Sequence, residues 1–138
     1  MVACSVSVTT VADGVETKFD YTGEMSLGLQ SVQIRWKETQ AEVLLSVKED
    51  TAEIKRAGDY SLNLFLKKGA TLAGRIGISG SEGEVQTYTR YFAYSIREKS
   101  ALLSFKYDLI IGAEKQRMGI RILARQNGNY IDKAGETI

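Results

Sequence analysis

Residues 101–111 read Ala101-Leu102-Leu103-Ser104-Phe105-Lys106-Tyr107-Asp108-Leu109-Ile110-Ile111, and this stretch decides the fold. Its odd-numbered side chains are all apolar or aromatic, while its polar side chains stand only at even-numbered positions. Such a period of two is typical of a β-strand that buries one face. A turn signal at 112–114 follows, and residues 117–123 then alternate again. The two segments therefore predict a pair of long antiparallel strands.

Turn signals recur roughly every ten residues along the rest of the chain. They are Asp13-Gly14, Gly28, Glu49-Asp50, Ala57-Gly58-Asp59, Lys68-Gly69, Gly80-Ser81-Glu82-Gly83, Glu98-Lys99-Ser100, Gly112-Ala113-Glu114 and Asn127-Gly128-Asn129. We expect an all-β protein, an antiparallel up-and-down meander of about 8–10 strands that closes into a barrel. A pair of packed sheets is the alternative, and the barrel is favoured because closure removes exposed sheet edges.

Two segments leave the local structure open. Residues 37–49 fit a helical stripe as well as a strand, and we favour the strand because a helix here would lack a clear cap. Gly74 and Gly77 interrupt another strand-like segment, where interior glycines mark bends, bulges or a close approach of two backbones.

Composition and charge limit the class of protein. The chain has 138 residues, which we divide into one domain over 2–126 and a polar, mobile tail over 127–138. Its 18 basic and 17 acidic residues give a net charge of +1, so no global field attracts nucleic acid or anionic lipid. The single cysteine, Cys4, favours a reducing compartment, and no segment is apolar enough for export or membrane insertion. We expect a cytoplasmic protein.

Catalytic and metal sites have little support in the sequence. There is no histidine, which removes the commonest general base and the commonest metal ligand. We therefore expect no catalytic residue, no metal and no cofactor, and we favour a protein that is not an enzyme. The acidic pairs Glu82 with Glu84 and Glu49 with Asp50 are expected to be solvated turn residues, although a two-carboxylate hydrolytic site stays open.

One aromatic segment suggests a binding site. In a regular strand Tyr88, Arg90, Phe92 and Tyr94 would share one face, with the arginine between aromatic rings. A guanidinium beside ring faces can hold an anion next to a planar apolar group. The alternative is that Arg90 lies on the outer face or pairs with a neighbouring carboxylate, while the aromatic residues belong to the core.

Two further residues complete the predicted ligand-binding set. Arg56 has the parity of Ala52 and Ile54, which directs it inward, and a buried arginine needs a partner. It either reaches solvent at the barrel rim or anchors an anion inside. Trp36 ends an alternating segment with its side chain directed inward.

Several short motifs resemble a known family. They are residues 2–10 with Asp13-Gly14, Tyr21-Thr22-Gly23-Glu24, Ala52-Glu53-Ile54-Lys55-Arg56-Ala57-Gly58, Phe65-Leu66-Lys67-Lys68-Gly69 and Phe105-Lys106-Tyr107-Asp108-Leu109. Together they resemble the YwiB-like family of small bacterial proteins. The resemblance implies a lipocalin-like, calycin-type barrel without an established function, so it assigns no functional residue.

Three functions follow from these observations. The first is non-enzymatic binding of a small, partly apolar, possibly anionic ligand in the barrel mouth. The second is a structural or interaction module with a filled barrel, acting as a homodimer through its outer face or an edge. The third is weak RNA binding through the aromatic strand and Arg117, Arg121 and Arg125, which is disfavoured because these arginines are spaced too sparsely to follow a phosphate backbone.

Overall fold

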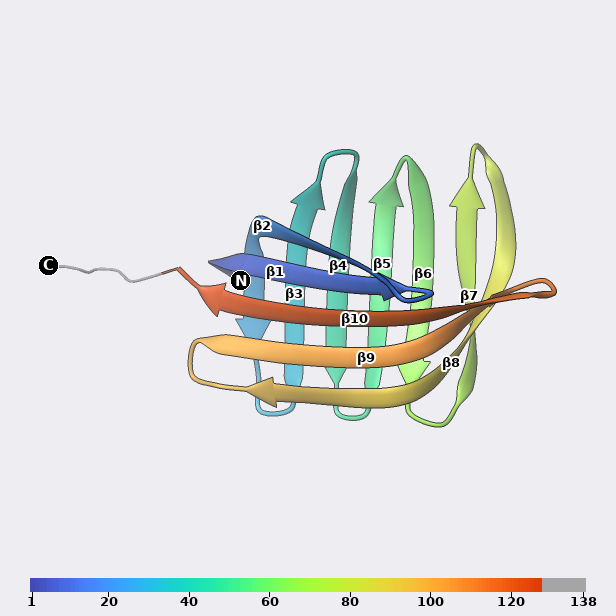
Figure 1. Cartoon of the computed structure of the whole chain (residues 1–138). Helices are drawn as coiled ribbons and strands as arrows, with labels where there is room; N and C mark the ends of the chain where they lie inside the picture. Colours follow the sequence, from blue (N-terminus) through green and yellow to red (C-terminus); the bar gives the residue numbers. More distant parts are fainter. Residues whose placement is uncertain (128–138) are drawn as a thin grey trace, which may run out of the picture.

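Ten antiparallel strands follow one another around a closed barrel in this computed structural model, which describes residues 1–127 (Figure 1). The strands are β1 (Val2–Ala12), β2 (Val15–Leu27), β3 (Ser31–Glu38), β4 (Ala41–Lys48), β5 (Thr51–Gly58), β6 (Tyr60–Lys67), β7 (Thr71–Ile78), β8 (Ser81–Ile96), β9 (Ser100–Ile111) and β10 (Glu114–Gln126). The first and last strands pair from Cys4 opposite Gln126 to Ala12 opposite Met118, which closes the barrel. The predicted up-and-down meander is therefore confirmed.

The segment 37–49, which suited both helix and strand, contains the end of β3, a turn and the whole of β4. Val43, Leu45 and Val47 are buried in this strand, and Leu44 and Ser46 lie between them on the other face. The described residues contain no helix, so none is long and apolar enough to cross a membrane. The predicted tail over 127–138 falls, apart from Asn127, outside the described residues; the backbone N–H of Asn127 donates to the carbonyl of Ala3.

The barrel is flattened into two crossing layers. Figure 1 shows β1, β9 and β10 running across β3 to β7, while β2 and β8 bend from one layer into the other. Strand β2 pairs with β1 from Val15 to Met25 but with β3 only from Gly23 to Leu27. A Cβ atom on Gly23 would collide with the carbonyl oxygen of Arg35, so this corner needs a glycine.

A second close approach lies where β6 and β7 separate. Their pairing stops at Asn63 opposite Arg75, and a Cβ atom on the next residue, Gly74, would collide with the Asn63 carbonyl. Of the bend, bulge or close approach expected at Gly74, the structure shows the close approach. The separation is bridged by Thr87 of β8, whose hydroxyl donates to the carbonyl of Phe65.

Inward-facing side chains fill most of the barrel interior. The largest fully buried ones are Phe105, Met25, Ile34, Leu45, Leu64, Leu66, Leu103 and Ile122. Each contributes about 2–3 kcal/mol by its removal from water. Two-residue periodicity thus produces one continuous core between the two layers.

Strand β8 contains a β-bulge, which changes the predicted site. Thr89 lies opposite Tyr107 and Tyr91 lies opposite Lys106, so Arg90 is an extra residue in the ladder. An extra residue exchanges the inner and outer positions of everything that follows it. The prediction that Tyr88, Arg90, Phe92 and Tyr94 share one face is therefore wrong: Tyr88 and Arg90 are on the outer face, and Phe92 and Tyr94 pack against the core.

Candidate functional site

A cavity of about 180 Å³ remains between the two layers, at the end where β3 and β5 finish and β4 and β6 begin. Its lining is Val8, Thr10, Trp36, Glu38, Val43, Leu45, Ile54, Arg56, Tyr60, Leu62, Leu64, Tyr107, Ile120 and Ile122. An apolar cavity of about 150 Å³ can hold benzene, whereas pockets for larger ligands measure about 300–1,000 Å³. The space therefore suits a body about the size of one six-membered ring.

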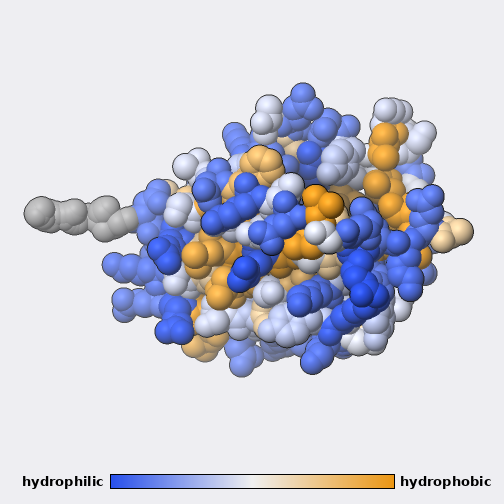
Figure 2. Space-filling view, in the orientation of Figure 1, coloured by the Kyte–Doolittle hydropathy of each residue, from blue (hydrophilic) through white to orange (hydrophobic). Residues whose placement is uncertain are grey.

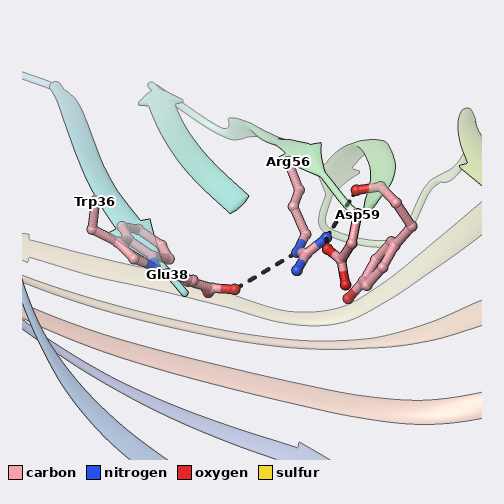
Figure 3. Close-up of polar contacts among 5 residues, drawn as sticks. Trp36, Glu38, Arg56 and Asp59 are labelled. Atoms are coloured by element: carbon pink, nitrogen blue, oxygen red, sulfur yellow. Dashed lines mark hydrogen bonds and ion pairs between the residues drawn. The ribbon is translucent and has the colours of Figure 1, made fainter. Parts of the chain in front are cut away.

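Arg56 is the cation of this cavity. It comes from the end of β5, and its side chain is 13% exposed. Its Nη1 donates to Asp59 Oδ1 at 2.8 Å and to the Tyr60 carbonyl at 2.8 Å, while Nε lies 3.6 Å from Glu38 Oε1 (Figure 3). The guanidinium carbon also lies 3.7 Å from the centre of the Tyr60 ring, a cation–π contact. The partner that a buried arginine requires is present, and Arg56 stands at the rim.

Glu38 is held on both sides. One oxygen faces Arg56, and the other accepts a hydrogen bond from Trp36 Nε1 at 3.2 Å. Trp36 in turn stacks on Tyr21, with ring centroids 6.3 Å apart. Figure 3 shows Arg56 between Glu38 and Asp59, with Trp36 on the far side of Glu38. A row of aromatic and charged side chains therefore borders the cavity.

Burial and charge change three pKa values around the cavity. The hydrogen bond from Arg56 holds the pKa of Asp59 below its ordinary value, so Asp59 stays ionised near neutral pH. Burial, with Tyr60 nearby, raises the pKa of Tyr107 to about 12, which leaves its hydroxyl a proton donor. Burial and the Glu38 carboxylate also raise the pKa of Tyr21, and Arg56 opposes this shift.

The six predicted ligand-binding residues do not converge. Only Trp36 and Arg56 line the cavity. Phe92 packs on Phe105 with centroids 4.9 Å apart, and the Tyr94 hydroxyl donates to the Gln30 carbonyl at 3.3 Å.

The other two predicted residues lie on the outer surface. Tyr88 is 38% exposed, and Arg90 forms a 2.7 Å ion pair with Asp108. The alternative in which Arg90 lies outside and pairs with a carboxylate is therefore the one observed. Arg90 cannot serve a ligand in the barrel mouth.

Sequence reasoning missed Glu38, Asp59, Tyr60 and Tyr107. The alternation of Ile34 and Trp36 would have placed Glu38 on the inner face, and Tyr107 has the parity of Phe105. Asp59 and Tyr60 carry no such signal, because the chain turns at Asp59 between β5 and β6.

The outer surface carries other candidates, among them a larger and more open pocket of about 490 Å³ that Arg56 also borders. Figure 2 shows hydrophobic residues exposed in the middle of one face, where β1 and the first half of β2 pass in front of β5 and β6. Arg117, Arg121 and Arg125 are exposed on β10. Among residues 1–127, no three potential metal ligands cluster together.

Fold and site together define a small closed β-barrel with a cavity at one end and a charged rim. The model of the family described as Domain of unknown function (DUF1934) matches residues 5–120, so the chain belongs to this family. The crystal structure of YwiB protein from Bacillus subtilis is similar in fold, with a TM-score of 0.80 and 20% sequence identity, over 92% of this chain and 93% of that one. The YwiB-like resemblance is thereby confirmed. A search of curated proteins gave no significant match.

Proposed function

We propose that this barrel binds a small, partly apolar ligand with an anionic group, and that it does so without catalysing a reaction. The observation that carries the proposal is the apolar cavity with the Arg56 guanidinium among its lining residues. The apolar body would occupy the space bordered by Leu45, Ile54 and Ile122, and the anionic group would lie at the rim. The free, buried Cys4 is compatible with the cytoplasmic location expected from the sequence.

The expected affinity is modest. Burying about 200 Å² of apolar ligand surface contributes about 5 kcal/mol, before the cost of immobilising the ligand is subtracted. Such a balance corresponds to dissociation constants of roughly 0.1 mM or weaker. A natural ligand would gain further affinity from the charged rim, where the anion meets a guanidinium that is already held in place.

The single tryptophan gives a direct binding assay, because Trp36 lines the cavity. Titration with benzoate and with benzyl alcohol, followed by Trp36 fluorescence, should show saturable binding. Thr10→Phe would fill the cavity mouth and abolish the response. Thr9→Phe is the matched control, since the neighbouring residue faces the opposite side of β1 and lines no part of the cavity.

The role of the cation is tested separately. Arg56→Met should weaken benzoate binding much more than benzyl alcohol binding, because only benzoate carries a charge. Arg35→Met removes an exposed arginine from the outer face of β3 and should change neither. If neither probe binds, or if Thr10→Phe and Thr9→Phe respond alike, the proposed cavity site is wrong.

A structural role is the second candidate, favoured by the largely filled interior. In this case the barrel would act as an interaction module that forms a homodimer. Phe19 and Val15 on the β1–β2 hairpin are 60% and 67% exposed and would be available for contact. Light scattering that gives the mass of a single chain at high protein concentration would contradict the homodimer.

A further inference from the structure

Asp59 and Glu38 both face Arg56, but the structure holds them differently. Glu38 is 28% exposed in its side chain and has both oxygens engaged, by Arg56 and by Trp36. Asp59 is 45% exposed and stands in the turn between β5 and β6. It can turn into water without opening the core, whereas Glu38 cannot leave without breaking its bond to the indole.

The guanidinium would keep its place if Asp59 moved away. Its Nη1 would still donate to the Tyr60 carbonyl, its face would still lie on the Tyr60 ring, and Nε would still face Glu38. An arginine held in this way is preorganised for an incoming acceptor, because little conformational freedom is left to lose.

Asp59 leaves part of the hydrogen-bonding capacity of the Arg56 guanidinium unfilled. One bond joins Asp59 Oδ1 to Nη1, and within residues 1–127 no hydrogen bond from Nη2 of Arg56 is found. A carboxylate that approached along the edge defined by Nη1 and Nη2 would make two parallel bonds. Paired bonds of this kind are stronger and more directional than a single one.

Glu38 restricts the charge of the incoming group. Once Asp59 has moved away, the charges of Arg56 and Glu38 cancel. A ligand with a single negative charge then takes the place of the Asp59 carboxylate as the second partner of the guanidinium. A dianion would face the fixed Glu38 carboxylate, and this repulsion is not compensated by a second cation among the residues that line the cavity.

We propose that Asp59 is a built-in occupant of the anion position on Arg56, and that the ligand displaces it as a monocarboxylate with an apolar body about the size of one ring. This inference rests on the proposed function and names its ligand class. Asp59 then lowers the affinity of the empty protein for its ligand. A neutral apolar molecule of the same size cannot replace Asp59 on Arg56. Such a molecule therefore gains only the apolar part of the binding energy.

The test compares three probes of one shape, benzoate, benzyl alcohol and phenylphosphonate in its dianionic form, by Trp36 fluorescence. Asp59→Asn removes the competing charge and should raise benzoate affinity by about tenfold, with benzyl alcohol unchanged. Asp59→Ser is the second variant, because the backbone at residue 59 is not in the left-handed region and accepts any side chain. Phenylphosphonate should bind more weakly than benzoate in every variant.

Asp50→Asn is the matched control, since Asp50 also lies in a turn and faces a single cation, Lys67, at 3.9 Å. It should leave all three affinities unchanged. If benzyl alcohol binds but both Asp59 variants leave benzoate affinity unchanged or lower it, the inference is overturned while the cavity site stands. If phenylphosphonate binds more tightly than benzoate, the monocarboxylate class is wrong. If no probe binds, the proposed function fails as well.

Discussion

At the scale of single residues, the buried polar groups determine how the barrel responds to its surroundings. Asp108 is the clearest case, because its side chain is 5% exposed and one of its oxygens, Oδ1, has no partner within the described residues. Its other oxygen depends on Arg90, the extra residue of the β-bulge. The bulge therefore positions the cation that compensates a buried charge.

Removing that cation should destabilise the fold. Arg90→Met leaves the Asp108 carboxylate buried and uncompensated, which we expect to cost about 2–3 kcal/mol of unfolding free energy, since Arg90 is itself partly exposed. The double variant Arg90→Met with Asp108→Leu should recover most of this loss, because both charges are then absent. Urea unfolding of the wild type, both single variants and the double variant measures these free energies. Arg121→Met serves as the control, because Arg121 is exposed. Equal losses in the single and double variants would contradict this interpretation.

Because the pKa of Tyr107 is raised, we expect the protein to lose stability at alkaline pH. Its pKa of about 12 in the folded protein lies above the ordinary value of 10, so the folded state resists ionisation that the unfolded chain permits. The contribution is complete below pH 10 and is lost between about pH 10 and 12. At pH 11 the loss relative to Tyr107→Phe should be about 1.4 kcal/mol. Urea midpoints of both proteins at pH 8 and pH 11 measure it, and parallel changes would exclude Tyr107 as the cause.

At the scale of strands, the corners decide the shape of the barrel. Gly23 lets β2 leave β3, and Gly74 lets β7 leave β6. Both glycines lie against a backbone carbonyl, which cannot move aside as a flexible side chain can. The cavity lies between the two layers, where the side chains do not fill the space completely.

A methyl group at a corner should therefore be costly. Gly23→Ala places a Cβ against the Arg35 carbonyl, and we expect it to reduce the free energy of unfolding by about 1–3 kcal/mol. Gly83→Ala is the control, because its Cβ would lie 4.0 Å from the nearest atom, Cγ2 of Ile76. Its effect should stay within about 0.5 kcal/mol. Thermal unfolding of the two variants compares them, and similar losses would show that the corner tolerates a side chain.

Strand positions were predictable from the sequence because burial on one face imposes a period of two. This signal correctly assigned residues 101–111, and it directed Trp36 and Arg56 into the interior. The signal failed after Thr89, because an inserted residue exchanges the inner and outer positions that follow it. The sequence on either side of the insertion still alternates, so the pattern alone does not reveal it. Asp59 was missed for a different reason: a turn residue follows no face, so its contact with Arg56 depends on the three-dimensional path of the turn.

At the scale of the whole molecule, closure joins segments that are far apart in the chain. The pairing of β1 with β10 connects residues more than one hundred positions apart, such as Cys4 and Gln126. Non-local pairing of this kind slows folding, and all-β domains fold in roughly milliseconds to seconds. The absence of proline from all 138 residues removes one further source of slow folding.

Refolding should consequently lack the phase of tens of seconds that prolyl isomerisation produces. In an interrupted-unfolding experiment, protein held in denaturant for seconds and protein held for an hour should refold with the same rate and amplitude. Trp36 fluorescence reports the reaction. A slow phase that grows with time in denaturant would contradict this expectation.

The β-bulge also determines how related sequences should be aligned. Because Thr89 and Tyr91 already stand opposite consecutive residues of β9, a chain lacking residue 90 would keep every other pair of this ladder in register. In an alignment of such a chain with this one, the structurally correct gap falls at position 90. This holds even where another gap position would align more aromatic residues with one another. Alignments that place the gap elsewhere would compare side chains from opposite faces of the wall.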